Sequence, residues 1–471
     1  MRSEYHSLKA HKTFYHVLDD EIRPITCKWV FKLKTNADGS RRYKTRLAAR
    51  GFAQVHGVDY SEIFAPVAQL TTFCIYVALA LELQATIYHL DVVTAFLNPL
   101  IEEPTAIIIP EGIEWLDPQL AQELTPSSKL PLNQALYGLK QAPRLWYKDI
   151  AGTLTLLGFC PSASDANLYL SQSKKMMVLL YVDLILLFAQ GNHMVHVNEV
   201  KTALQSRYQI TDLGPAKQYL GITINQSPAK TTLSQSRFVL TQFERFGLHD
   251  RNGQLTQREP GSRTKTESPP LPPHEIKTYQ AIVGGIMYIM LATRPDLAYS
   301  ISILSQHAAN PHEHQLGMAK RALRYLKNTS KLCLIYIKAS TSPIAQQALR
   351  WPTTTDFTDS DWAGDPTNRP STAAFVFLLG GTAISWKSKK QSLIALSTTE
   401  AEYVAASEAS QEGVWLRHIL SEIHKTFLTL EDSPSTSPPI VLYIDNQATI
   451  NLLRTLDSMS AQNISRSNAT I

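Results

Sequence analysis

The chain has 471 residues, of which 44% are hydrophobic and 18% charged, and its formal net charge is +5. This composition argues against a mainly disordered chain, and the length predicts two or three domains because single cores rarely grow beyond about 300 residues. Four widely spaced cysteines and the lack of a long apolar run argue against a disulfide scaffold, a zinc site and a membrane helix.

A basic β-hairpin is predicted near the N-terminus. Residues 28–34 and 41–47 alternate apolar and charged side chains on either side of the turn-forming residues 37–40. Between Lys28 and Arg50 there are eight Lys or Arg residues and one Asp. Such a hairpin is either an ordinary solvated surface or a ribbon whose cations and aromatic rings contact nucleic-acid phosphates.

Two predicted strand segments, each carrying one carboxylate, follow. A core helix is predicted for residues 71–83, and residues 87–92 have the pattern of a buried strand that ends near Asp91. Residues 178–189 are apolar except for Asp183 and its neighbour Tyr181, and we interpret them as a hairpin. An isolated Asp at such a strand end is more often a helix N-cap. Together, the two carboxylates predict a site for two Mg²⁺ ions, which would activate a primer hydroxyl and stabilise a leaving pyrophosphate.

Proline-rich segments divide the rest of the chain. Residues 254–275 and 432–439 are predicted linkers, and a softer break lies at 340–355. Between the linkers, residues 279–326 are mostly helical in pattern and precede a predicted strand at 332–337. The C-terminal part alternates strand and helix, which predicts a mixed sheet flanked by helices. Its predicted strands are 354–358, 373–379, 382–386 and 441–444, and its predicted helix runs from 398 to about 420.

Three acids of the C-terminal part occur in a recognisable order. Asp359 lies on the first predicted strand, Glu402 near the start of the helix, and Asp445 at the end of a later strand. This is the order of the ribonuclease H fold, in which clustered carboxylates bind two Mg²⁺ ions that activate water. Taken singly, Glu400 and Glu402 are more simply explained as acids favoured by the dipole of a helix N-terminus.

Many ordered motifs resemble the reverse transcriptase of copia-type long-terminal-repeat retrotransposons. They cover residues from about 4 to 250, and further matches to the ribonuclease H domain of the same family lie in the C-terminal part. The N-terminal matches are Lys28–Lys32, Tyr43–Leu47, Arg50–Gln54, Phe64–Val67, Leu90–Val92, Ala95–Leu97, Ala135–Arg144, Tyr181–Asp183, Asp212–Gly214 and Tyr219–Ile222. The later matches are Thr293–Leu297, Lys320–Lys327, Trp362–Asp365, Ser385–Gln391 and Glu400–Tyr403.

The resemblance assigns roles to matching positions. It implies that Asp91 and Asp183 bind Mg²⁺ (or Mn²⁺) for polymerisation and that Phe96 lies under the incoming sugar. It further implies that the ribonuclease H metals are bound by Asp359, Glu402 and Asp445. The remaining implied contacts are Lys32, Lys44, Arg46, Tyr137 and Lys140 with nucleotide or template, and Tyr219, Leu220 and Gly221 with the primer end.

The fold implied is α/β (α+β). We expect right-hand polymerase fingers and palm with a helical thumb or connection, followed by a ribonuclease H-like mixed-sheet domain. The expected partners are an RNA template, a DNA primer, an RNA–DNA hybrid and deoxynucleoside triphosphates, in a cytoplasmic (virus-like particle) or nuclear location without membrane or signal peptide. The expected divisions are 1–253 for fingers and palm, 254–275 for the linker, 276–350 for the thumb or connection and 351–471 for a C-terminally truncated nuclease domain.

The chain also departs from the family pattern. Leu184 stands where the family's Tyr-x-Asp-Asp box has its second Asp, either by substitution or by deletion of one residue. Cys74 replaces an Arg, Pro99 replaces a Gly, and a fourth nuclease acid is missing after Leu452. These departures predict a degenerate polymerase and nuclease with impaired activity. The alternatives are a catalytically inactive nucleic-acid-binding remnant and a chain that gives no stable product.

Overall fold

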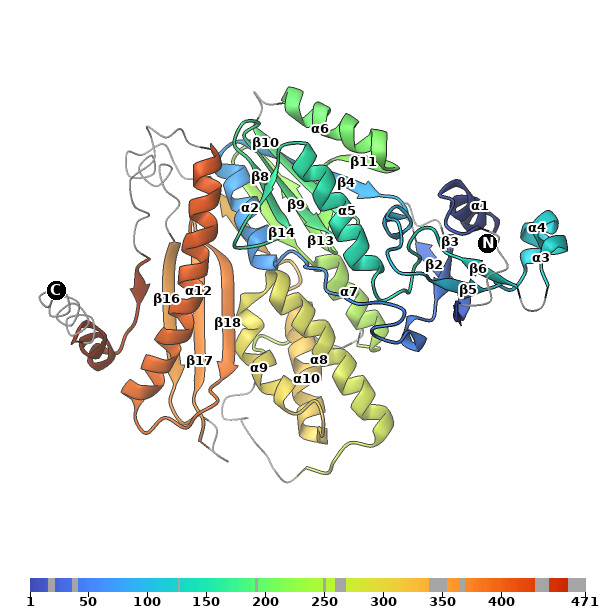
Figure 1. The fold of residues 1–471 in the computed structure, drawn as a ribbon. Coiled ribbons are helices and arrows are strands. Elements are labelled where there is room, and N and C mark those ends of the chain that lie inside the picture. The colour runs from blue at the N-terminus through green and yellow to red at the C-terminus, as the bar shows by residue number, and fades with distance from the viewer. Residues whose placement is uncertain are drawn as a thin grey trace, which may run out of the picture. The chain divides into compact units, whose positions relative to one another are not determined.

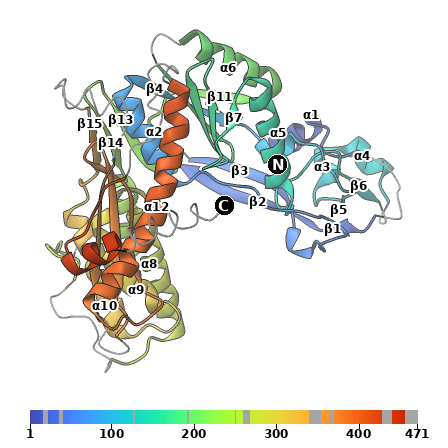
Figure 2. The same cartoon turned by 60° about the vertical axis from the view of Figure 1, so that its left-hand side comes forward.

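The computed structural model describes residues 1–15, 22–35, 41–125, 128–190, 194–248, 251–258, 268–338, 354–364, 369–427 and 440–455. They fall into two compact units, which the chain enters more than once. Unit 1 comprises Met1–Ala68, Tyr88–Ser162 and Ala166–Gly214, and unit 2 comprises Gln69–Ile87, Ala163–Asp165 and Pro215–Ile471. The predicted mixed α/β architecture is confirmed, with several sheets and flanking helices (Figures 1 and 2). Within the described ranges, no helix is long and apolar enough to cross a membrane.

The basic hairpin forms in unit 1 as predicted. Strand β2 (Cys27–Thr35) pairs antiparallel with β3 (Arg41–Ala49), while the predicted turn at 37–40 lies outside the described residues. Paired side chains share a face of the ribbon, so Lys32 and Lys44 lie on one face, and Phe31 and Tyr43 lie on the other. The hairpin therefore has a basic face and an exposed aromatic face. Around it lie α1 (Arg2–Ala10), η1 (Gly51–Ala53), α3 (Ile113–Leu116), α4 (Pro118–Glu123) and a sheet of β1 (Pro24–Ile25), β5 (Ala106–Ile108) and β6 (Lys129–Pro131).

A six-stranded sheet in the order β11-β4-β10-β9-β8-β7 carries the apolar run of the sequence. Because β9 and β10 pair with Tyr181 opposite Leu184, Val182 and Asp183 form a two-residue turn. Both faces of these two strands are buried, which explains why their sequence is continuously apolar. The strands are β4 (Ala85–Val92), β7 (Cys160–Pro161), β8 (Leu168–Ser171), β9 (Met176–Tyr181), β10 (Leu184–Gln190) and β11 (Ile210–Pro215), accompanied by η2 (Ala95–Leu97), α5 (Ala142–Leu156) and α6 (Met194–Arg207).

Unit 2 contains a second sheet and most of the predicted helical segment. The sheet has the order β12-β13-β14-β15, and its last strand follows the helices in sequence. The predicted core helix at 71–83 is also part of this unit, as α2 (Leu70–Glu82). The other elements are β12 (Gln218–Tyr219), β13 (Ile222–Gln226), β14 (Lys230–Ser234), α7 (Ser236–Arg245), α8 (Pro273–Thr293), η4 (Pro295–Leu297), α9 (Ala298–Gln306), α10 (Glu313–Asn328) and β15 (Leu334–Ile337).

The C-terminal sheet has the order β18-β17-β16-β19, in which β19 is parallel to β16 and the other pairs are antiparallel. One long helix, α12, packs on β16 and β17. Small residues line its buried face, which allows a close approach to the sheet: Ala401, Ala405, Ala406, Ala409 and Gly413. The elements are β16 (Thr354–Asp361), β17 (Thr372–Leu379), β18 (Thr382–Lys390), α12 (Thr398–Phe427) and β19 (Leu442–Tyr443), and the predicted linker at 432–439 lies outside the described residues.

The basic side chains of α10 hold a neighbouring chain segment. Arg321 donates to the Thr256 hydroxyl (3.0 Å), Arg324 to the Asn252 carbonyl (2.7 Å) and Lys327 to the Arg251 carbonyl (2.8 Å). These three residues recur every three positions and so lie along one side of the helix. The beginning of the predicted linker is thus fastened to α10, and these cations are engaged within the unit.

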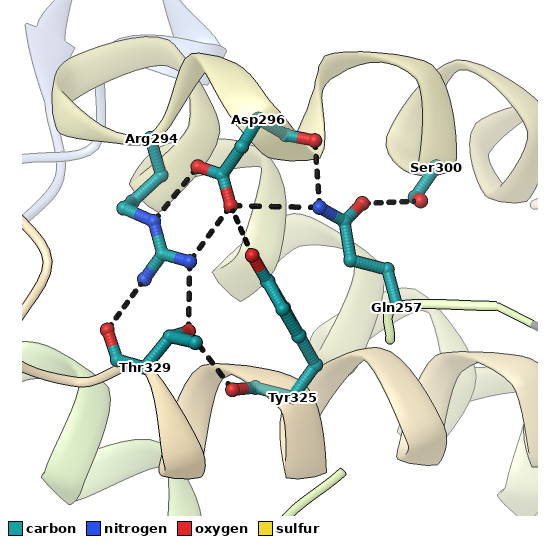
Figure 3. Close-up of polar contacts among 6 residues, drawn as sticks. All are labelled: Gln257, Arg294, Asp296, Ser300, Tyr325 and Thr329. Atoms are coloured by element: carbon teal, nitrogen blue, oxygen red, sulfur yellow. Dashed lines mark hydrogen bonds and ion pairs between the residues drawn. The ribbon is translucent and has the colours of Figure 1, made fainter. Parts of the chain in front are cut away.

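An arginine-centred network joins four segments of unit 2 (Figure 3). Arg294 is 3% exposed and makes a bidentate pair with Asp296, with both nitrogen–oxygen distances 2.8 Å. It also donates to the backbone carbonyl (2.9 Å) and hydroxyl (2.8 Å) of Thr329 at the end of α10. Tyr325 donates to Asp296, and Gln257 donates to the Asp296 carbonyl while accepting from Ser300. The network fixes the corner between α8 and α9 against the end of α10.

We expect Arg294→Ala to lower the free energy of unfolding by about 3 kcal/mol, because it removes the bidentate cationic partner of Asp296 and the donor to the Thr329 carbonyl. The measurement is urea-induced unfolding followed by circular dichroism. The matched control is Arg237→Ala, which removes an exposed arginine from α7 and should change stability by about 0.5 kcal/mol or less. Equal losses in the two variants would contradict the role given to the network.

Candidate functional site

Three acids of unit 2 meet in space. One carboxylate oxygen each of Asp359, Glu402 and Asp445 lies within 4.8 Å of the other two, and among the described residues this is the group with metal-ligand geometry. Asp359 comes from β16, Glu402 from the second turn of α12, and Asp445 follows β19 by two residues. The structure thus brings together the acids that the sequence order grouped.

Glu402 is the buried member of this group. It is 5% exposed, and its Oε1 accepts a hydrogen bond from the Ser360 backbone N–H at 3.0 Å. Its Oε2 is buried and has no hydrogen-bond partner among the described residues. Burial raises the pKa of Glu402 to about 7, and the Asp359 and Asp445 carboxylates act in the same direction. The hydrogen bond from the Ser360 N–H acts in the opposite direction and lowers the pKa. A cluster of oxygen ligands with one unpartnered buried oxygen fits a hard divalent cation such as Mg²⁺.

The two glutamates at the start of α12, Glu400 and Glu402, have different surroundings. Glu400, in the first turn of α12, accepts a hydrogen bond from the Leu396 backbone N–H at 2.6 Å, and its own N–H donates to the Ser397 hydroxyl at 3.1 Å. Gln391 was not predicted as a site residue, although it lies in a matched motif. It is buried and donates to the Ala401 carbonyl at 2.9 Å, which holds the first turn of α12 in place.

The two acids of unit 1 lie on neighbouring strands. The Val92 backbone N–H on β4, next to Asp91, donates to the Asp183 carbonyl at 2.8 Å. His89, on the same face of β4 as Asp91, is buried, and burial lowers its pKa while the Asp183 carboxylate opposes the shift. Leu184 begins β10 opposite Tyr181 and is half-buried. The arrangement brings the Asp91 and Asp183 backbones together, with an apolar side chain following Asp183.

Arg46, Phe96 and Tyr137 form one cluster beside Asp183. The Arg46 guanidinium lies 4.6 Å from the centroid of the Tyr137 ring, and the Phe96 ring meets that ring edge-on at 5.8 Å. Burial raises the pKa of Tyr137 to about 12, and the Glu4 and Asp183 carboxylates add to the effect. Glu4 on α1, which the sequence did not single out, also has a raised pKa caused by burial and opposed by Arg46.

A close backbone crossing fixes Tyr137 against the hairpin. The Ala49 N–H at the end of β3 donates to the Tyr137 carbonyl at 2.7 Å. Gly138 follows with φ +89°, and a Cβ there would lie 2.2 Å from the Ala49 carbonyl oxygen. A glycine is therefore required, which gives a physical reason for the glycine in this motif.

The other predicted contact residues are placed separately. Lys140 donates to the Gln54 carbonyl and the Tyr60 hydroxyl, both at 3.2 Å, and is directed toward those residues. Lys32 and Lys44 lie on the basic face of the hairpin. Tyr219, Leu220 and Gly221 form the β12–β13 turn in unit 2, where Tyr288 donates to the Leu220 carbonyl.

Carboxylates collected at strand ends beside basic and aromatic side chains are typical of metal-dependent enzymes that act on nucleic acids. A family model described as reverse transcriptase (RNA-dependent DNA polymerase) matches residues 12–260. The chain belongs to this family and is a copia-type Pol polyprotein region, which confirms the resemblance seen in the sequence.

The relatives are transposon proteins. The chain is 35% identical over 92% of its length to the retrovirus-related Pol polyprotein from transposon TNT 1-94 of Nicotiana tabacum. It is 34% identical over 90% of its length to that from transposon RE1 of Arabidopsis thaliana. The chain spans 32% and 27% of those two polyproteins. A putative transposon Ty5-1 protein of Saccharomyces cerevisiae is 33% identical over its whole length and 69% of this chain.

The raised pKa of Glu402 predicts a pH-dependent stability. Between its ordinary pKa of 4.5 and about 7, the folded chain keeps a proton that the unfolded chain has lost, so stability falls as pH rises through this range. Buried Asp356, whose pKa burial raises to about 6, acts in the same direction. With a chelator present, Glu402→Gln should therefore raise stability at pH 8 by about 1–3 kcal/mol and leave it nearly unchanged at pH 4.

Thermal unfolding at both pH values measures this effect. Asp356→Asn is the comparison variant. It should also raise the stability of the chain at pH 8, but it should leave the stabilisation by added Mg²⁺ unchanged. Adding Mg²⁺ at pH 8 should stabilise the native chain more than Glu402→Gln, because the cation binds the folded state. Loss of stability at pH 8 in Glu402→Gln would refute the assigned shift.

Proposed function

We propose that the chain is an RNA-directed DNA polymerase with a ribonuclease H domain, dependent on Mg²⁺ or Mn²⁺. The observation that supports the polymerase is the Val92–Asp183 backbone hydrogen bond, which places Asp91 at the end of β4 close to Asp183 in the β9–β10 turn, with Arg46 and Tyr137 nearby. Asp91 and Asp183 would hold the cations, which supply activation of the primer hydroxyl and neutralisation of the leaving pyrophosphate. The expected substrates are an RNA template, a DNA primer and deoxynucleoside triphosphates.

The chain's own residues would position the nucleotide. Arg46 supplies a guanidinium suited to bidentate contact with phosphate, and its approach to the Tyr137 ring keeps it in place. Phe96, packed edge-on against Tyr137, would provide the flat surface under the sugar. The Tyr219–Gly221 turn would contact the primer end, and the basic face of the hairpin would contact the template backbone.

A nuclease function is supported by the C-terminal sheet. The acids on β16, on α12 and after β19 have the order expected for ribonuclease H, and they lie on one mixed sheet with a long helix packed on it. Asp359, Glu402 and Asp445 would hold two cations, which supply an activated water against the RNA strand of a hybrid. We therefore keep the division into fingers and palm, linker, thumb or connection, and nuclease domain as part of the proposal.

We further propose that both activities are impaired. Leu184 leaves the β9–β10 turn with one carboxylate, so less negative charge faces the cations than in the family's box. No fourth acid among the described residues joins the nuclease group. The second candidate is a catalytically inactive nucleic-acid binder, which the hairpin with its basic face and exposed aromatic face favours.

We expect Leu184→Asp to raise primer extension on an RNA template by about tenfold or more, because it restores a carboxylate beside Asp183. The assay compares the native chain, Leu184→Asp and Leu184→Asn with Mg²⁺ or Mn²⁺. Leu184→Asn is the control for polarity without charge and should give little gain. A native chain that extends primers as fast as Leu184→Asp contradicts the proposed impairment, and binding of primer–template without extension in every variant favours the second candidate.

Cleavage of a labelled RNA–DNA hybrid tests the nuclease. Asp359→Asn should abolish any cleavage that the native chain shows, since it removes one member of the carboxylate group. Asp361→Asn, on the same strand but outside that group, is the matched control and should keep the native rate. Cleavage that survives in Asp359→Asn would show that another site or a contaminant is responsible.

A further inference from the structure

The turn that carries Asp183 has an unusual backbone. Val182, the first of its two residues, has φ +54°, in the left-handed region. This region is unfavourable for a β-branched side chain, whose branch meets the backbone there, and such conformations cost about 1–3 kcal/mol. A two-residue hairpin turn favours positive φ at this position, which glycine usually supplies, so a valine is retained there only where further contacts hold it.

Two hydrogen bonds hold this turn from different elements. The Trp146 indole N–H on α5 donates to the Val182 carbonyl at 2.6 Å, and the Val92 N–H on β4 donates to the Asp183 carbonyl at 2.8 Å. Successive carbonyls of the turn are thus fixed from the helix layer and from the neighbouring strand. The orientation of the peptide between Val182 and Asp183, and with it the direction of the Asp183 side chain, follows from the first of these bonds.

Trp146 is itself held firmly. Its side chain is 1% exposed in the unit 1 core, and its ring meets Tyr208 edge-on at 5.2 Å. Tyr208 is in turn fixed by hydrogen bonds to Thr153 (2.7 Å) and Asp149 (2.8 Å) on α5. The indole donor is therefore rigid, and it can impose a geometry on the turn instead of adapting to it.

We propose that Trp146 is a positioning residue, whose indole N–H holds Val182 at positive φ and so directs the Asp183 carboxylate toward Asp91. This inference rests on the proposed polymerase function of Asp183. Because Leu184 leaves Asp183 as the one acid of the turn, the direction of that carboxylate decides whether a cation can be held by this strand pair. Without the indole donor, the strain at Val182 is opposed by the hairpin pairing and the Val92 hydrogen bond alone, and the direction of Asp183 is less firmly fixed.

The test uses the full chain. Every variant carries Asp359→Asn, which weakens cation binding at the acid cluster of unit 2, so that the measured Mn²⁺ binding is that of unit 1. The variants used for kinetics also carry Leu184→Asp. Trp146→Phe keeps an aromatic ring in the core but removes the donor. We expect a loss of Mn²⁺ affinity and of kcat by roughly tenfold to a hundredfold, with a smaller change in KM for the nucleotide. Mn²⁺ affinity is measured by electron paramagnetic resonance, which does not depend on activity.

Rescue distinguishes positioning from packing. Glycine adopts positive φ without cost, so Val182→Gly should restore most of the Mn²⁺ affinity and kcat to Trp146→Phe. The matched control is Trp386→Phe, which removes the same kind of indole-to-carbonyl bond, to Met290 at 3.0 Å in unit 2, and should leave Mn²⁺ affinity unchanged.

Each outcome decides. Native affinity and kcat in Trp146→Phe, or a defect that Val182→Gly does not relieve, overturns the proposal. If Trp146→Phe fails to fold, the single variant Val182→Gly decides: a raised melting temperature with unchanged Mn²⁺ affinity supports an enforced conformation, and a lowered melting temperature refutes it. If the starting chain, with Asp359→Asn and Leu184→Asp, binds Mn²⁺ but extends no primer, the polymerase function is refuted, and the Mn²⁺ affinity still tests the role of Trp146. If the starting chain neither binds Mn²⁺ nor extends a primer, both proposals are overturned.

Discussion

The burial of one carboxylate beside two others is the constraint on which the acid cluster of unit 2 depends. Two unit charges no more than 4.8 Å apart repel by at least about 3 kcal/mol at an effective dielectric constant of about 20. The nuclease group brings three acids to that distance, and it buries one of them. Burial of Glu402 raises its pKa to about 7, the Ser360 N–H opposes this shift, and the Asp359 and Asp445 carboxylates add to it. A divalent cation bound by these oxygens would offset the cost of charging Glu402.

The fold tolerates this repulsion because packing elsewhere places the acids. The alanines on the buried face of α12 let the helix lie close to β16, which brings Glu402 beside Asp359. Parallel pairing of β19 with β16 then brings Asp445 to the same end of the sheet. Apolar contact area far from the charges thus supplies the free energy that the charges oppose. Preorganisation of this kind is what a metal-dependent site requires.

The features that could be predicted from the sequence are those that depend on residues close to one another in the chain. The hairpin at β2 and β3, the strands around Asp91 and Asp183, and the order of the nuclease acids each follow from alternation or from short motifs. Contacts over long sequence separations could not be predicted in this way. No local pattern indicates that Glu4 would lie near Arg46, or that Trp146 would donate to Val182. Likewise, the regular cations of α10 have the pattern of a free basic surface, although Arg321, Arg324 and Lys327 bond a segment about 70 residues away.

Leu184 shows why the fold and the chemistry of this chain can diverge. Within the β9–β10 hairpin, a leucine opposite Tyr181 extends an already apolar strand and adds no unsatisfied charge, so a leucine at this position is compatible with the fold. The cost falls on cation binding, where the turn offers the carboxylate of Asp183 alone. The indole and backbone hydrogen bonds that fix this turn do not involve the Leu184 side chain, and they persist in its presence. The backbone geometry of the turn is therefore independent of the Leu184 side chain, which is why Leu184→Asp can add a carboxylate without a change of fold.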